Sequence, residues 1–159
     1  MRIAHLLHHA CQKEDKRFVR DLYRQLLNRE PTEEEMEPHV TALKSGVSRT
    51  DLMIRFILSE EAKNVYFGQP PDDAPTVANK LKRIVSLEPE RLVHELYVEL
   101  LCRDPDPEGY EDHVNSLRQG AHPLDIVQSF MTSPEWSDLM RADRNSIARK
   151  ILFHLLSKL

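Results

Sequence analysis

Glycine is scarce in this chain of 159 residues, which has four glycines against ten prolines. Folds built on tight hairpins, Gly-rich phosphate loops or flexible linkers need more glycine than this. Aromatic residues are also few, at 6%, and the formal net charge is −4 at pH 7. Because nucleic-acid-binding domains normally carry a basic stripe, this composition argues against a nucleic-acid partner.

Cysteine and long apolar runs are nearly absent as well. Cys11 and Cys102 are too few to form a disulfide framework, which favours a reducing compartment. The longest mostly apolar run, residues 151–156, is far too short to span a bilayer. Histidines interrupt the apolar stretch of the first ten residues, unlike the unbroken core of a signal peptide. We therefore expect a cytoplasmic protein with no membrane span.

The chain does contain an internal repeat. A shift of 74 residues aligns residues 18–62 with residues 92–136 without a gap, and 17 of the 45 aligned positions are identical. Unrelated segments of that length would share roughly three identities, so the match indicates a duplication. Residues 3–7 and 146–151 also resemble the segment 76–81. We expect three copies of a leading helix, with two complete modules between them.

Each repeat has the residue spacing of α-helices. Apolar residues recur on one helix face at Phe18, Val19, Leu22 and Tyr23, at the spacing i, i+1, i+4 and i+5. Residues 32–35, Thr-Glu-Glu-Glu, have the pattern of a capping box at a helix start. In the same segment of each repeat a glycine, Gly46 or Gly120, stands where a helix is expected to end.

These patterns predict an all-α fold of tandem duplicated helical modules, with about four helices each. The expected boundaries place module 1 at residues 1–67 and module 2 at residues 76–142. The proline-rich residues 68–75 form the linker, and residues 143–159 form a C-terminal apolar helix.

Motifs in both repeats resemble a known bacterial family. They include Leu27-Asn28-Arg29-Glu30-Pro31, Leu43-Lys44-Ser45-Gly46, Leu101-Cys102-Arg103-Asp104-Pro105-Asp106, Leu117-Arg118-Gln119-Gly120 and Phe130-Met131-Thr132-Ser133-Pro134-Glu135. The family is the domain of unknown function 4214, which is similar to phycobilisome linker domains. The resemblance implies an all-α accessory module of larger proteins, such as surface-layer proteins, secreted repeat proteins and glycosyltransferases, and it brings no catalytic residues. The first repeat departs from the family pattern at Glu35, where glycine is preferred.

Six polar or amphipathic side chains are retained in both repeats and are candidate interaction residues. They are Tyr23 and Tyr97, Arg29 and Arg103, and His39 and His113. For the arginines, a structural ion pair or bonds to helix-closing carbonyls is the favoured interpretation, and ligand binding is the alternative. The histidines lie on an apolar helix face, which indicates half-buried rather than ligating side chains.

Residues 104–109 resemble part of a calcium loop. Asp104, Asp106 and Glu108 occupy positions 1, 3 and 5 of such a loop, and Gly109 occupies position 6. Position 12, which needs a bidentate carboxylate, is Asn115. The favoured interpretation is that Asp106 caps a helix, with calcium binding as a weak alternative. We expect no metal and no cofactor.

The C-terminal helix is the best candidate for an interaction surface. Its apolar residues, including Ile151 and Leu155, cover more than one helix face, and such a helix should be buried on several sides. It could cap the second module, because repeat arrays need covered ends, or it could form a homodimer.

The sequence contains no serine or cysteine nucleophile with an identifiable base, so we do not expect an enzyme. We expect a non-catalytic protein–protein interaction, targeting or scaffolding module, as an accessory unit of a larger bacterial assembly. The alternative is a glycan-binding accessory domain of a glycosyltransferase or cell-surface polysaccharide system. That alternative is motivated by four residues near the module ends that we expect to be exposed, namely Trp136, Tyr66, Tyr110 and Arg103.

Overall fold

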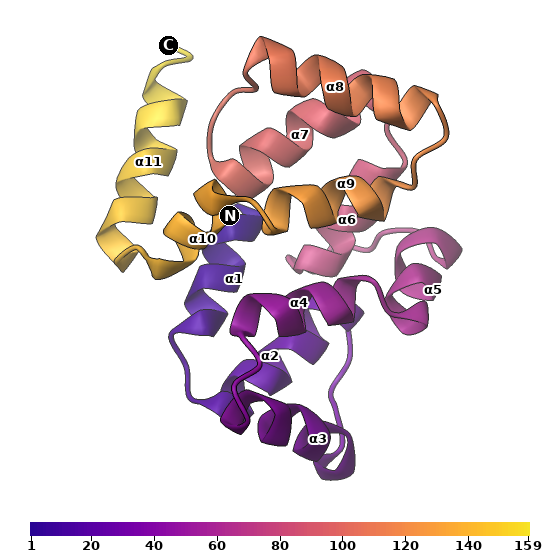
Figure 1. Cartoon of the computed structure of the whole chain (residues 1–159), viewed down its shortest axis with the longest axis vertical. Helices are drawn as coiled ribbons and strands as arrows, with labels where there is room; N and C mark the ends of the chain where they lie inside the picture. The colour runs from indigo at the N-terminus through magenta and orange to yellow at the C-terminus, as the bar shows by residue number, and fades with distance from the viewer. The chain divides into compact units, whose positions relative to one another are not determined.

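A computed structural model describes all of residues 1–159 and contains eleven α-helices and no strand (Figure 1). The first repeat supplies α1 (Ile3–Cys11), α2 (Asp15–Leu27), α3 (Glu33–Lys44), α4 (Arg49–Ile57) and α5 (Glu60–Gly68). The second repeat supplies α6 (Val77–Val85), α7 (Pro89–Leu101), α8 (Pro107–Arg118), α9 (Pro123–Met131) and α10 (Pro134–Arg141), and α11 (Arg144–Leu156) follows. The all-α fold is confirmed. Each repeat has five helices, because Ser59 and Ser133 each cap a short additional helix.

Helix starts and ends follow local capping chemistry. Thr32 and Glu35 form the expected capping box, in which each side chain accepts a hydrogen bond from the backbone N–H of the other. Asp106 caps α8 by accepting from the N–H of Gly109 at 2.9 Å. Gly46 and Gly120 follow the ends of α3 and α8 with φ of 106° and 100°, a left-handed conformation that favours glycine.

The chain divides into two compact units whose boundaries fall within α1 and α6. His9–Arg83 form one unit, which we call the first-repeat unit because it holds α2 to α5. Met1–His8 and Ile84–Leu159 form the other, called the second-repeat unit. The compact units therefore differ from the expected modules, because each contains most of the leading helix that belongs to the other repeat in sequence.

The same hydrogen bond holds the exchanged leading helix in each unit. In the first-repeat unit, the N–H of Val77 on α6 donates to Gln25 Oε1 on α2 at 3.1 Å. In the second-repeat unit, the N–H of Ile3 on α1 donates to Glu99 Oε2 on α7 at 2.8 Å. Both partners of the two bonds are related by the 74-residue shift. The duplication therefore preserved both the leading helix and its receiving site.

The core of the first-repeat unit forms around α2, which packs against α3, α4 and α5. Its largest fully buried side chains are Phe18, Leu22, Leu26, Leu52, Met53 and Leu81. Tyr66 on α5 is also buried, and its hydroxyl donates to the carbonyl oxygen of Leu26 at 2.8 Å. This hydrogen bond connects α5 to the C-terminal half of α2.

The second-repeat unit has the same arrangement, with α7 packed against α8, α9 and α10. Trp136 on α10 is fully buried, and the expectation that Trp136 and Tyr66 are exposed is wrong. Helix α10 packs on α7 and α9, and Trp136, three positions after the N-cap residue Ser133, is buried in the core. The position equivalent to Trp136 in the first repeat is Ala62, which is also buried.

Candidate interaction site

The retained polar residues of the first repeat form one cluster on α2, α3, α4 and α5. The guanidinium carbon of Arg29 lies 4.9 Å from the centroid of the Tyr23 ring, a cation–π distance. The Phe56 ring meets the Tyr23 ring edge-on, at 4.9 Å between centroids, and lies 4.9 Å from the His39 ring. Arg29 donates from Nε to Glu61 and from an Nη atom to Glu35, both at 2.5 Å.

The second repeat reproduces this cluster. Arg103 lies 5.0 Å from the Tyr97 ring centroid, and its Nε donates to Glu135 at 2.7 Å. The Phe130 ring lies 4.8 Å from Tyr97 and 5.0 Å from the stacked ring of His113. We call these two sets of residues the arginine–aromatic clusters.

The contacts in the arginine–aromatic clusters are structural, because they hold helices of the same unit together. Both guanidinium groups are ion-paired within their own unit, where Arg29 joins the start of α3 to the start of α5. Burial lowers the pKa of His39 and of His113, and Arg55 lowers that of His39 further, so both imidazoles are neutral at pH 7. Neither cluster contains a nucleophile next to a base.

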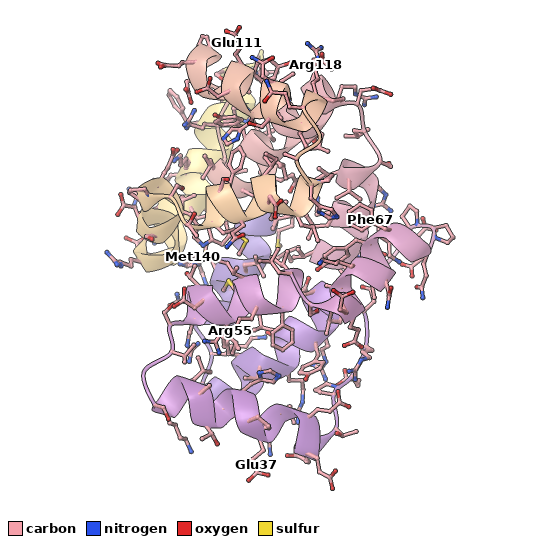
Figure 2. All side chains as sticks on the ribbon, turned by 45° about the vertical axis from the view of Figure 1, so that its right-hand side comes forward. Glu37, Arg55, Phe67, Glu111, Arg118 and Met140 are labelled. Atoms are coloured by element: carbon pink, nitrogen blue, oxygen red, sulfur yellow. The ribbon has the colours of Figure 1, made fainter.

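A small cavity of about 150 Å³ opens beside the cluster of the first repeat. The rings of Tyr23, His39 and Phe56 line it, together with Arg55, an exposed side chain on α4 that is labelled in Figure 2. The second repeat has Ser129 in place of Arg55, so the two clusters differ in charge at this edge.

Gly109 and Glu35 occupy equivalent positions and explain a difference between the clusters. A Cβ at Gly109 would clash with the hydroxyl of Tyr97 and lie 2.8 Å from a carboxylate oxygen of Asp106. Glycine is therefore required there while Tyr97 keeps this position. The first repeat instead has a carboxylate at this position, which pairs with Arg29, and this hydrogen bond lowers the pKa of Glu35.

The acidic residues of the candidate calcium loop are engaged in other contacts. Asp106 caps α8 and also accepts from Arg103 at 3.2 Å. Asp104 accepts from His154 and Lys158 near the end of α11. No group of three or more His, Cys, Asp or Glu side chains has an arrangement that could hold a metal ion.

The contact between Asp104 and α11 predicts an unusually acidic carboxyl group. His154 Nε2 lies 2.9 Å from Asp104 Oδ1, and Lys158 Nζ lies 2.5 Å from Oδ2. Arg2 can only donate to His154 Nδ1, so Nε2 carries the hydrogen that is donated to Asp104. These hydrogen bonds lower the pKa of Asp104 to about 2.

Because this pKa is lowered in the folded protein, the contribution of Asp104 to stability is complete above the usual carboxyl pKa. It is lost as the pH falls toward 2. Carboxyl NMR should find Asp104 titrating near pH 2, and a His154→Ala substitution should raise that pKa toward 3.8. An Asp104 pKa that does not respond to His154→Ala would contradict the contact.

Helix α11 is attached to the second-repeat unit along one side and leaves the other side uncovered (Figure 1). Ile147 and His154 are buried, Ile151 is half-buried, and Lys150 pairs with Glu135 at 3.6 Å. On the uncovered side, which we call the outer face of α11, large apolar side chains are more than half exposed. They are Leu152, Phe153, Leu155, Leu156 and Leu159.

The structure does not gather the candidate interaction residues into one site. Six lie in the two arginine–aromatic clusters, Trp136 is in the core, and Ile151 and Leu155 are on α11. Of the aromatic residues that motivated the glycan-binding alternative, Trp136 and Tyr66 are buried and Tyr110 is half-buried.

Sequence reasoning missed Arg49, which holds the α1–α2 turn. Its Nη1 donates to the carbonyl oxygens of Cys11 at 2.8 Å and Lys13 at 2.6 Å, and its Nη2 donates to Asp15 at 2.9 Å. The second repeat has Pro123 at this position, so comparison of the two repeats did not single out Arg49.

Comparison with known proteins identifies the repeats. The family model described as a domain of unknown function (DUF4214) matches residues 7–66 and again residues 78–140. The chain belongs to the DUF4214 family. A comparison with curated proteins and with solved structures finds no match. Each DUF4214 match covers the segment that carries one arginine–aromatic cluster. Helix α11 lies beyond both matches, and none of the helices is both long and apolar enough to cross a membrane.

Proposed function

We propose that this DUF4214 protein is a non-catalytic protein–protein interaction and scaffolding module, and that the outer face of α11 is its docking surface. The observation that carries the proposal is the set of five large apolar side chains exposed within the last eight residues. Contiguous exposed apolar surface of this kind is typical of interaction sites. The rest of the chain has only two other large hydrophobic side chains that are exposed, Met1 and Phe67.

The state of the cysteines supports a non-catalytic role in a reducing cytoplasm. Both are free thiols, with Cys102 buried and Cys11 partly so. Burial raises the pKa of Cys11 to about 11 and also raises that of Cys102. Since the thiolate is the nucleophile, neither side chain is activated for covalent chemistry at neutral pH.

A photo-crosslinking amino acid placed on the outer face of α11 tests the proposal. Benzoylphenylalanine at Phe153, in the full chain expressed in its own host, should form covalent adducts with protein on irradiation. The matched control is the same amino acid at Glu111, an exposed residue on α8 of the same unit that points outward in Figure 2. Absence of protein adducts at position 153, or equal labelling at 111, would contradict the proposal.

A further inference from the structure

The cavity beside the arginine–aromatic cluster of the first repeat combines aromatic walls with a cation. Its rings are those of Tyr23 on α2, His39 on α3 and Phe56 on α4. Tyr23 and Phe56 are buried and His39 is half-buried, so the packing of the unit holds these walls in place. A volume of about 150 Å³ is enough for one six-membered ring, since apolar cavities of that size bind benzene. The lining is completed by Leu27, Arg55, Ser59 and Glu61.

Arg55 supplies a positive charge that no carboxylate of the chain pairs with. Its side chain is exposed and forms neither a salt bridge nor a hydrogen bond. Burial, and then the charge of Arg55, lower the pKa of His39, so this charge acts at the ring wall of the cavity. Five other arginines of the same unit each pair with a carboxylate, namely Arg17, Arg20, Arg24, Arg29 and Arg49.

The acidic residue of the lining does not cancel this charge. Both carboxylate oxygens of Glu61 accept hydrogen bonds from Arg29, at 2.5 Å from Nε and 3.3 Å from Nη2. Because His39 is neutral at pH 7 and Glu61 is ion-paired, Arg55 is the lining residue whose charge is left unpaired. The cavity therefore favours a ligand with a negative charge.

The second repeat differs from the first at this place in both charge and ring arrangement. Ser129 stands at the position of Arg55, so the cation is missing. The ring planes of His39 and Phe56 are inclined by 54°, whereas those of His113 and Phe130 are inclined by 28° and stack. Tilted rings leave an edge open between them, whereas stacked rings close it.

We propose that this cavity binds a small aromatic carboxylate. The ring of the ligand packs against Tyr23, His39 and Phe56, where aromatic rings favour edge-to-face and offset contacts. Its carboxylate accepts hydrogen bonds from the guanidinium of Arg55, whose forked N–H groups match two carboxylate oxygens. The site goes beyond the proposed function, because it lies in the first-repeat unit and does not involve the outer face of α11.

Titration of the full chain with benzoate at pH 7, followed by NMR, tests the site. The resonances of Tyr23, His39 and Phe56 should shift and saturate with a Kd of about 1 mM, a weak affinity because so small a ligand makes few contacts. The equivalent resonances of the second repeat, those of Tyr97, His113 and Phe130, should not shift. Equal shifts in both clusters, or no saturable shift at His39, would overturn the proposal.

An Arg55→Gln substitution tests the cation. It should raise the Kd for benzoate by about tenfold, because a charge-assisted hydrogen bond is lost, while the spectrum without ligand keeps the dispersion of the unmodified chain. The matched control is Arg17→Gln, which changes an exposed arginine of α2 outside the cavity and should leave the Kd unchanged. Unchanged binding in Arg55→Gln would overturn the assignment of Arg55 to the site.

Two further probes separate the contribution of the ring from that of the charge. Benzyl alcohol has the ring without the charge, and acetate has the charge without the ring. Each should bind about tenfold more weakly than benzoate. Acetate binding as well as benzoate would show only attraction of anions to Arg55, and equal binding of benzyl alcohol would show only an apolar cavity. Either result overturns the aromatic carboxylate and leaves the role of α11 standing.

Discussion

Replacing Trp136 with alanine is expected to lower the free energy of unfolding of the second-repeat unit by about 3–5 kcal/mol, as is typical for removal of a buried Trp. The side chain is fully buried on α10, which packs against both α7 and α9. Its loss leaves a cavity where three helices meet. Hydrogen–deuterium exchange should show faster exchange in α7, α9 and α10, with little change in α2, α3 and α4.

The control for this substitution is Trp136→Phe. The indole Nε1 is buried and has no hydrogen-bond partner, so phenylalanine removes an unpaired donor while keeping most of the apolar volume. We expect a smaller loss of stability than for alanine. If Trp136→Ala and Trp136→Phe were equally stable, packing of the indole would not be what holds α10 in place.

The duplication also explains which parts of this fold could be predicted from the sequence. Thr32, Asp106 and the two glycines at 46 and 120 act through backbone groups within a few residues, so the helix boundaries follow from local patterns. The assignment of leading helices to units depends on contacts far apart in the chain. Because α2 and α7 are copies, both offer a similar receiving surface, and periodicity does not distinguish between them.

The same limit applies to the candidate site. Retention in both repeats singled out the six residues that lie in the arginine–aromatic clusters, because a shared environment preserves shared side chains. Trp136 is not retained in the first repeat, where the equivalent residue is Ala62. Alanine occurs both in protein cores and on protein surfaces, so this position did not indicate burial. The apolar residues of α11 pointed to burial on several sides, but the amount of its surface left uncovered depends on how the rest of the unit meets it.

Among the polar side chains of the first-repeat unit, Arg49 is the one whose substitution should lower the stability of that unit most. An Arg49→Ala substitution is expected to lower the free energy of unfolding by about 3 kcal/mol, because hydrogen bonds to a charged group contribute about 1.5–3 kcal/mol. It removes the donors to the carbonyl oxygens of Cys11 and Lys13 and a cation–π contact with Phe18 at 4.6 Å. Urea denaturation measures the loss.

Arg49→Lys separates charge from geometry. A lysine keeps the positive charge near Asp15 but has no planar fork to reach two carbonyl oxygens and a carboxylate at once. We therefore expect it to recover only part of the stability, and amide exchange in the α1–α2 turn to stay fast. Full recovery by lysine would mean that charge alone holds the turn. The second repeat, with Pro123 at this position, has no such side chain, so the effect should be confined to the first-repeat unit.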